Sequence, residues 1–326
     1  MKYQAKDLGQ FPGEIRFAVE NFPSSGLKID DFNNILLCGL GGSGIAGRII
    51  KSYFLDKSTI PVEVISDYFV PQYVGKRTLA IMCSYSGNTE ETLAMYDAAK
   101  IKGATIISIA TGGKLRERTI KDGYKFYQAQ PGFQPRMALG YSLSYLLLIF
   151  SELCGMPGTA NELSAASEAL DDEQKYLERA TRLLLDIESS LPAKIVVVTD
   201  YFTNPIGLRF CQQIQENAKS EAFLHELPES NHNVIESYYG KLNSIFFFIN
   251  SQNQPRTGLR FRFLKGVLEE NGNTVQEINL NSTGLADVLE TIYVLDWLSL
   301  LIADHKAVNS SLIKNINALK DYLSAN

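Results

Sequence analysis

Hydroxyl groups are concentrated in one short stretch of the chain, SYSGNTEET at residues 84–92. The apolar run before it, residues 78–83, is typical of a buried parallel strand, and a helical pattern follows it. The first N–H groups of a helix have no intrahelical partner and carry partial positive charge, so nearby hydroxyls could join them in binding a phosphate. Gly87 would allow the close backbone approach that such binding needs. The candidate hydroxyls are those of Ser84, Ser86 and Thr89.

A structural role explains the same stretch equally well, because Ser86 or Thr89 could cap the helix while the other hydroxyls are solvated. A glycine-rich turn earlier in the chain, GLGGSG at residues 39–44, also lies between a strand and a helix. Its glycines nearly match the dinucleotide fingerprint, and Asp67 follows the next strand, residues 62–65, where an acidic residue is expected. The glycines indicate a tight turn that something approaches closely, and they leave the ligand open.

Strands and helices alternate through the first half of the chain, which predicts a doubly wound parallel sheet. Ligands of such sheets bind at the carboxyl ends of the strands. Both turns directly follow a strand, so both lie at that edge, and this shared position favours phosphate binding over simple capping. The strands are expected at residues 35–38, 62–65, 78–83, 104–110 and 124–127.

The same order of elements restarts after a polar helical stretch, offset by 160 to 169 residues. This predicts a duplicated architecture: an N-terminal domain over residues 1–153, a helical linker over 154–192 and a C-terminal domain over 193–326. The second copy has no turn rich in glycine and hydroxyls, so we expect it to supply chemistry. Its strands are expected at residues 194–199, 222–225, 243–249 and 274–278.

Few ionisable side chains are placed for chemistry, and each also has a plain alternative. Arg136 precedes an expected helix, where a cation opposes the dipole, so it is either functional or part of a surface salt bridge. Glu216, near an apolar helix face without a lysine four residues away, could act as a base or be solvated. His232, in a polar loop, could be an acid or base or a surface histidine. His305 and Lys306 end an apolar helix, where a cation is stabilising in any case.

Composition narrows the class of protein. The chain has 326 residues, a net charge of -5 and 45% hydrophobic residues, as in a soluble globular protein of two ordinary domains. The mild acidity gives no reason to expect nucleic acid, no apolar run reaches the length of a membrane span, and the N-terminus lacks the apolar core of a signal peptide. Four widely spaced cysteines predict reduced core thiols, and three histidines argue against a His-rich metal site. We therefore expect a cytoplasmic protein.

Together these motifs resemble those of the bifunctional phosphoglucose/phosphomannose isomerases, which carry two sugar isomerase (SIS) domains. The resemblance covers roughly residues 33–326 and includes the duplication. It implies two doubly wound parallel-sheet α/β domains of the SIS type, flavodoxin-like with three αβα layers. The matching motifs are GGSG at 41–44, SYSGNTEET at 84–92, Pro135-Arg136, Glu216-Asn217 and SNHN at 230–233.

The resemblance implies a metal-independent aldose–ketose isomerisation without a cofactor. Glucose 6-phosphate, and also mannose 6-phosphate, would be interconverted with fructose 6-phosphate through a cis-enediol. The partners would be these hexose 6-phosphates and a second copy of the chain in a homodimer, with neither nucleic acid nor a membrane. The sugar and phosphate would be bound by Gly42, Ser43, Ser84, Ser86 and Thr89.

The resemblance also implies a catalytic role for each ionisable candidate. Glu216 would move a proton between C2 and C1. Arg136 would stabilise the enediolate, because negative charge develops on oxygen there. His232 would assist ring opening from across the dimer interface. Lys306 would assist the same step, with His305 as its rival.

Other classes of protein share SIS domains and stay open as alternatives. A non-catalytic sugar-phosphate sensor would normally carry a DNA-binding helix-turn-helix region, for which about thirty residues before the first strand are too few. An enzyme of the glucosamine 6-phosphate synthase type would need an amide-hydrolysing domain before residue 33. An isomerase of another phosphosugar is the remaining alternative.

Overall fold

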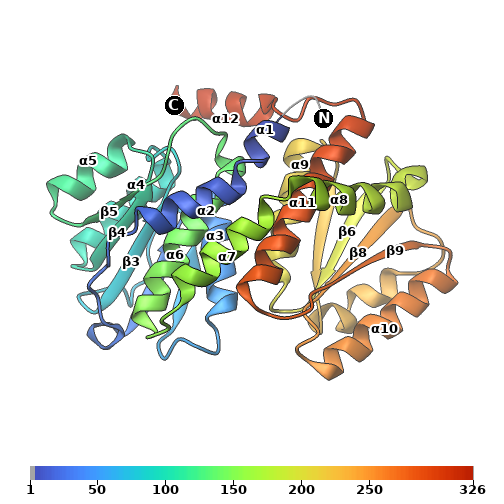
Figure 1. The fold of residues 1–326 in the computed structure, drawn as a ribbon, viewed down its shortest axis with the longest axis horizontal. Coiled ribbons are helices and arrows are strands. Elements are labelled where there is room, and N and C mark those ends of the chain that lie inside the picture. Colours follow the sequence, from blue (N-terminus) through green and yellow to red (C-terminus); the bar gives the residue numbers. More distant parts are fainter. Residues whose placement is uncertain (1–3, 326) are drawn as a thin grey trace. The chain divides into compact units, whose positions relative to one another are not determined.

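The structure is a computed structural model that describes residues 4–325 (Figure 1). These residues form two compact units, each with its own parallel sheet. The N-terminal unit consists of Gly9–Asp172 and Thr283–Leu289. The C-terminal unit consists of residues 4–8, Glu173–Ser282 and residues 290–325.

The sheet of the N-terminal unit has five strands within the described residues, in the order β2-β1-β3-β4-β5. All neighbouring strands are parallel. This is the flavodoxin-like order, in which the chain changes direction across the sheet between β1 and β3. The predicted doubly wound fold is therefore confirmed. The strands are β1 (Asn34–Cys38), β2 (Val62–Ile65), β3 (Thr78–Cys83), β4 (Thr105–Ala110) and β5 (Lys125–Gln128).

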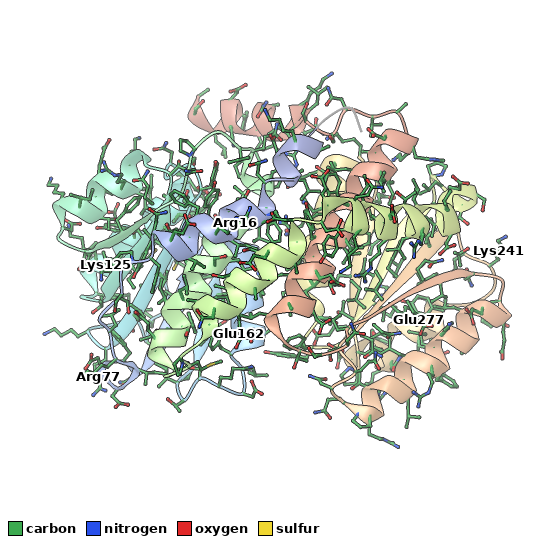
Figure 2. All side chains as sticks on the ribbon, viewed as in Figure 1. Arg16, Arg77, Lys125, Glu162, Lys241 and Glu277 are labelled. Carbon is green, nitrogen blue, oxygen red and sulfur yellow. The ribbon has the colours of Figure 1, made fainter. Side chains whose placement is uncertain are left out.

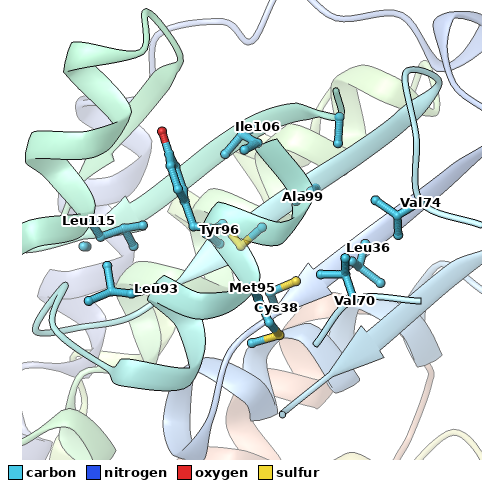
Figure 3. Close-up of a cluster of buried hydrophobic side chains, with 14 residues drawn as sticks. Leu36, Cys38, Val70, Val74, Leu93, Met95, Tyr96, Ala99, Ile106 and Leu115 are labelled. Atoms are coloured by element: carbon cyan, nitrogen blue, oxygen red, sulfur yellow. The ribbon is translucent and has the colours of Figure 1, made fainter. Parts of the chain in front are cut away.

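Helices cover both faces of this sheet, because successive side chains of a buried strand point to opposite faces. On one face Leu36 and Met82 pack with Met95 and Tyr96 of α4, in the cluster drawn in Figure 3. On the other face Gly47 of α3 lies against Leu37. The helical segments are α2 (Phe11–Glu20), η1 (Ile29–Asp31), α3 (Gly41–Tyr53), α4 (Glu90–Ile101), α5 (Gly113–Lys121), η2 (Pro135–Met137), α6 (Leu139–Leu153) and α7 (Thr159–Leu170).

The C-terminal unit repeats the first four positions of that topology. Within the described residues its sheet has four parallel strands in the order β7-β6-β8-β9. On one face Phe246 and Phe248 pack with Phe261 of α10 (Pro255–Glu270). On the other Phe247 contacts Phe210 of α9 (Asn204–Asn217), with ring centroids 5.1 Å apart. The strands are β6 (Lys194–Thr199), β7 (Ala222–Glu226), β8 (Ser244–Asn250) and β9 (Thr274–Asn279).

The helical segments of the C-terminal unit include two long apolar or amphipathic helices, α9 and α11, that carry candidate catalytic residues. α11 starts with the residues 285–289 that belong to the N-terminal unit. The segments are α1 (Ala5–Leu8), α8 (Glu173–Ile187), η3 (Glu188–Ser190), α9 (Asn204–Asn217), η4 (Glu229–His232), η5 (Val234–Ser237), α10 (Pro255–Glu270), α11 (Leu285–His305) and α12 (Lys314–Ser324).

The main local difference from the sequence-based prediction is that helices begin earlier. α3 starts at Gly41, inside the GLGGSG stretch at 39–44 that the sequence analysis places as a turn before the helix, and α9 starts at Asn204. Pro205 lies in the first turn of α9, where its missing N–H costs nothing and its fixed φ favours the helix. The GGSG segment is therefore the first turn of a helix, and its N–H groups belong to the positive end of that helix.

Candidate active site

Two of the predicted binding segments lie at the switch point of the N-terminal sheet. β1 and β3 are neighbours, with Cys38 opposite Met82, and the chain leaves them in opposite directions. Gly42 and Ser43 are in the first turn of α3, directly after β1, and residues 84–89 connect β3 to α4. Two helix N-termini therefore meet at the edge where flavodoxin-like sheets bind their ligands.

The hydroxyls of the turn at 84–89 form a compact group. Ser84 Oγ lies 2.7 Å from Thr89 Oγ1 and accepts a hydrogen bond from the Gly87 N–H at 3.1 Å. Thr89 is the N-cap residue of α4, but its side chain makes no cap hydrogen bond to the helix. The Thr89 hydroxyl is thus directed toward Ser84, and Ser86 is exposed beside them. The Thr89 hydroxyl is therefore bonded to Ser84 and does not cap α4.

Gly87 is required by the backbone of this turn. Its φ of +70° lies in the left-handed region, and a Cβ there would be 1.9 Å from the carbonyl oxygen of Gly112. No side chain fits such a gap, so the turn between β3 and α4 lies directly on the turn between β4 and α5.

Arg136 belongs to the same edge of the sheet. It lies in η2, and a Cβ at Gly42 would be 3.0 Å from Pro135 O and 3.7 Å from Arg136 Cα. Arg136 is 5% exposed, unlike Arg77 and Lys241, which are labelled in Figure 2 and are exposed. Arg136 is therefore not a surface side chain.

A buried carboxylate that the sequence analysis missed explains how a helix begins beside Arg136. Glu14 of α2 is 1% exposed, and its Oε2 accepts a hydrogen bond from Gly140 N, at the start of α6, at 2.8 Å. Negative charge at a helix N-terminus is favourable, so Glu14 offsets the unfavourable interaction of Arg136 with the α6 dipole. Glu14 reaches the start of α6 because α2 packs on α6. The sequence pattern of α2 is that of an ordinary amphipathic helix, so it does not predict this contact.

In the C-terminal unit Glu216 lines a cavity, and Lys306 bonds to residues that follow Glu216 in the chain. Glu216 is the penultimate residue of α9, is half-buried, and lines a cavity of about 500 Å³ with Lys219, Asn309 and Leu312. Lys306 follows α11, and its Nζ donates to Ala218 O at 2.9 Å and to the Ser220 hydroxyl. Lys306 therefore binds the end of the helix that carries Glu216.

Partial burial lowers the pKa of Lys306 from its ordinary value, which makes its neutral form more accessible. His305, by contrast, is the exposed last residue of α11. Among the two candidates for ring opening, Lys306 is the one in contact with the chain next to Glu216.

Asn217 and Ser299 fix the end of α9 from within. Asn217 is fully buried and donates from Nδ2 to Ser299 Oγ at 2.9 Å, and Ser299 donates to the Asp296 carbonyl oxygen at 2.6 Å. Asp296 also forms a buried ion pair with Arg209, from Nη2 to Oδ2 at 2.5 Å. The Asn217–Ser299 hydrogen bond and the Arg209–Asp296 ion pair both join α9 to α11, and they thereby fix the position of the helix end that carries Glu216.

His232 is not brought to Glu216 within one chain. α9 runs back from the carboxyl edge of the sheet, so Glu216 lies at the amino edge, just before β7 starts at Ala222. His232 is exposed in η4, after β7 ends at Glu226. The five residues of β7 separate the two edges by about 13 Å at the usual rise per residue.

The switch point of the second sheet is occupied by a side chain of the protein. Asp200, which is 5% exposed, accepts hydrogen bonds from Thr203 N at 2.9 Å, Thr203 Oγ1 at 3.0 Å and Ser251 N at 2.7 Å. These are the donor types that would bind a phosphate in the first sheet. In the second sheet the carboxylate of Asp200 already accepts from these donors.

No group of three or more His, Cys, Asp or Glu side chains in the described part of the chain is arranged to hold a metal ion. No helix between residues 4 and 325 combines the length and apolar character needed to cross a membrane.

Comparison with known proteins agrees with this architecture. A family model described as the bacterial phospho-glucose isomerase C-terminal SIS domain matches residues 178–323, and the SIS domain model matches residues 28–115. The C-terminal domain of glucosamine-fructose-6-phosphate aminotransferase from Francisella tularensis has a similar fold, with a TM-score of 0.70 over 95% of this chain and 98% of that one, at 15% identity. At that identity the similarity concerns the fold alone.

Proteins similar in sequence are more informative than those similar in fold alone. The bifunctional phosphoglucose/phosphomannose isomerase of Caldicellulosiruptor bescii is 36% identical over 317 residues, which cover 92% of each chain. The protein of the same name from Aquifex aeolicus is 33% identical over 301 residues, covering 90% of this chain and 91% of its own. The D-glucosamine-6-phosphate 4-epimerase of Sulfolobus acidocaldarius is 36% identical over 209 residues, covering 64% of this chain and 65% of its own. With identity at this level over nearly its whole length, the chain belongs to the family of bifunctional phosphoglucose/phosphomannose isomerases.

Proposed function

We propose that this protein interconverts fructose 6-phosphate with glucose 6-phosphate and mannose 6-phosphate through a cis-enediol, without a metal ion. The observation that carries the proposal is the switch point of the N-terminal sheet, where two helix N-termini, a hydroxyl cluster and the buried Arg136 lie together. A site of this kind suits a substrate with a phosphate at one end and a centre of developing negative charge at the other.

Substrate binding starts at the phosphate. The Ser84, Ser86 and Thr89 hydroxyls and the first N–H groups of α3 and α4 act as donors to the phosphate oxygens, and Gly42 lets the sugar approach the backbone. Because no reaction occurs at this end, its binding energy serves to orient C1 and C2 for proton transfer.

Glu216 is the base that takes the proton from C2 of the open-chain aldose and returns it to C1. As that proton leaves C2, electrons move into the C1–C2 bond and the carbonyl oxygen becomes an enediolate oxygen, which Arg136 stabilises. The proton of the C2 hydroxyl then moves to O1, so that the negative charge lies on O2. Return of the proton from Glu216 to C1, with formation of the C2 carbonyl, gives the ketose. The contact of Asn217 with Ser299 and the ion pair of Arg209 with Asp296 hold α9, and with it the Glu216 carboxylate, in place.

Ring opening precedes the isomerisation and is assigned to Lys306 and His232. Lys306 adjoins the end of α9, whereas His232 lies at the opposite edge of the sheet from Glu216. His232 therefore acts in the site of a second copy in a homodimer, where its exposure allows it to reach across an isologous interface. Its imidazole can donate a proton to the ring oxygen as the ring opens.

The experiment that tests the function is a coupled assay with fructose 6-phosphate in the presence of EDTA, following both aldose products. Appearance of glucose 6-phosphate and mannose 6-phosphate supports the full proposal. Glucose 6-phosphate alone would restrict the activity to one pair, and loss of activity on EDTA treatment would contradict the metal-free mechanism. Sugar-phosphate binding without either product would favour a non-catalytic sensor.

A matched variant identifies the base. Glu216→Gln keeps the size and polarity of the side chain but cannot accept the C2 proton, so we expect turnover to be lost while the affinity for fructose 6-phosphate stays nearly unchanged. Gln215→Glu in the same helix is a control for local charge, because Gln215 lines the same cavity. Retained turnover in Glu216→Gln would remove Glu216 from the mechanism.

A second candidate function is chemistry on an aminosugar phosphate. It is favoured by the 36% identity, over 209 residues, to a protein named D-glucosamine-6-phosphate 4-epimerase. The same preparation incubated with glucosamine 6-phosphate decides between the two. Consumption of this substrate without turnover of fructose 6-phosphate would replace the isomerase proposal.

A further inference from the structure

The segment that carries Arg136 is held by a side chain from another turn of the chain. Residues 130–136 follow β5 and run into the first two residues of η2, and they contain two prolines and a glycine, so few of their backbone groups belong to regular structure. The hydroxyl of Tyr85 donates to Gln130 O at 2.8 Å and accepts from Phe133 N at 3.1 Å. One side chain from another turn therefore satisfies two backbone groups of this loop.

Tyr85 comes from the turn that holds the candidate phosphate ligands, between Ser84 and Ser86. Its backbone is held as well, because its carbonyl accepts a hydrogen bond from Thr111 N at 2.8 Å. Its ring packs beside Phe133 on a small apolar cluster of Ala129, Ala138 and Tyr141. Backbone, ring and hydroxyl of Tyr85 are thus all fixed, which makes it a rigid link between the two segments.

The other side of the loop contacts the second candidate phosphate segment. A Cβ at Gly42 would lie 3.0 Å from Pro135 O, so the first turn of α3 touches the backbone next to Arg136. Movement of either phosphate-binding segment would therefore be transmitted to residues 130–136. Tyr85 makes its link to the loop through the two hydrogen bonds of its hydroxyl, so a single substitution can remove that link.

We propose that Tyr85 is a positioning residue that couples occupation of the phosphate site to the placement of Arg136. The inference rests on the proposed function and deepens it. A phosphate on Ser84 and Ser86 immobilises the turn, Tyr85 carries this order to Gln130 and Phe133, and Arg136 is held where the enediolate forms. Binding energy from the unreactive end of the substrate is thereby used for orientation at the reacting end.

Tyr85→Phe tests the link, since it removes the hydroxyl and keeps the ring in its cluster. Tyr145→Phe is the matched control, because the Tyr145 hydroxyl also donates to a backbone carbonyl, that of Gln128 at 2.9 Å, but outside residues 130–136. We expect Tyr85→Phe to lower kcat by about tenfold to a hundredfold, with the inhibition constant of inorganic phosphate changed less than about twofold. Tyr145→Phe should retain a kcat close to that of the natural chain.

Amide hydrogen exchange of the full chain, with and without inorganic phosphate, gives a readout independent of turnover. In the natural chain and in Tyr145→Phe, phosphate should increase the protection of residues 130–136. In Tyr85→Phe this segment should exchange faster, and phosphate should no longer protect it.

Two results would overturn the proposal. If phosphate protects residues 130–136 equally in Tyr85→Phe and the natural chain, the hydroxyl does not transmit order. If phosphate affinity falls in parallel with kcat, Tyr85 belongs to the phosphate site itself. Failure of the isomerase function is distinguishable, because the exchange experiment requires only that inorganic phosphate bind.

Discussion

Glu216 and His232 lie at opposite edges of the C-terminal sheet, Glu216 before β7 and His232 after it. The strand between them is paired along its whole length with β6, so no local rearrangement brings the two side chains together. If both act on one substrate, they come from different copies of the chain.

This relationship predicts complementation between two inactive variants. Glu216→Gln and His232→Ala should each be inactive alone. Mixed after unfolding and refolding together, they should recover about a quarter of the natural activity, since random pairing of a two-fold dimer gives half heterodimers with one intact site each. Activity measured against the mixing ratio should peak at equal amounts. Absence of any recovery, with heterodimers shown to form, would place both residues in one copy.

The hydroxyl pair of the phosphate site should contribute to affinity. Ser84→Ala combined with Thr89→Val should weaken the binding of a 6-phosphorylated sugar by about 1 kcal/mol for each lost hydrogen bond. The buried Thr119 and Ser108 hydroxyls form a similar pair at 2.7 Å outside the site, so Ser108→Ala with Thr119→Val is the control. Calorimetric titration should show weaker binding in the first double variant only, and equal affinities would move the phosphate elsewhere.

Gly87 should be indispensable for stability. Gly87→Ala places a Cβ 1.9 Å from Gly112 O at a positive φ, so we expect the free energy of unfolding to fall by more than about 3 kcal/mol. Gly41 also has a positive φ, of +52°, but has open space around its Cβ position. Gly41→Ala should therefore cost only about 1 kcal/mol. Urea unfolding compares the two, and similar losses would mean that the close approach at Gly112 relaxes easily.

Lys306, and not His305, should be needed for ring opening. Lys306→Met should reduce kcat strongly, whereas His305→Ala should have little effect, because His305 is exposed at the end of α11. Lys219→Met controls for lost support of this region, since Lys219 Nζ donates to Leu312 O at 2.6 Å. Steady-state kinetics with fructose 6-phosphate, read beside the melting temperatures, separates catalysis from stability. The reverse order of effects would exchange the roles of Lys306 and His305.

Lys306 should also make the free energy of unfolding depend on pH. Burial lowers the pKa of Lys306, so just below the ordinary lysine pKa the folded state binds fewer protons than the unfolded state. The contribution of this group to the free energy of unfolding therefore rises with pH across that interval. The difference in stability between the natural chain and Lys306→Met, measured from pH 8 to pH 11, should grow with pH in favour of the natural chain. A difference that stays constant would mean that the pKa is not lowered.

Thiol reactivity should follow burial. Burial raises the pKa of Cys83 to about 12 and that of Cys211 to about 12, and it raises the pKa of Cys38 further. Cys154 is less buried, although its pKa is also raised. At pH 8 a thiol reagent should therefore modify Cys154 first in the native protein and all four cysteines only after unfolding. Rapid native modification of Cys83 would show that the carboxyl edge of β3 opens.

The sequence by itself determined the fold class and the positions of the strands in both halves. β2, β3 and β6 have the limits predicted from the sequence. For β3 the reason is that a strand buried on both faces leaves a continuous hydrophobic signal. The placement of Ser84 and Gly42 at one edge also followed from sequence, since both come directly after parallel strands. Helix starts were less predictable, because the first turns of α3 and α9 are glycine-rich or polar and carry no apolar period.

Tertiary structure alone decided which side chains meet. Glu14 reaches the start of α6 from 126 residues away, and Tyr85 reaches Phe133 from 48 residues away, through packing that no local pattern encodes. The separation of His232 from Glu216 likewise depends on the direction of α9 relative to β7. Local propensity and periodicity report on neighbours a few residues apart, whereas these contacts depend on how elements distant in the chain pack together.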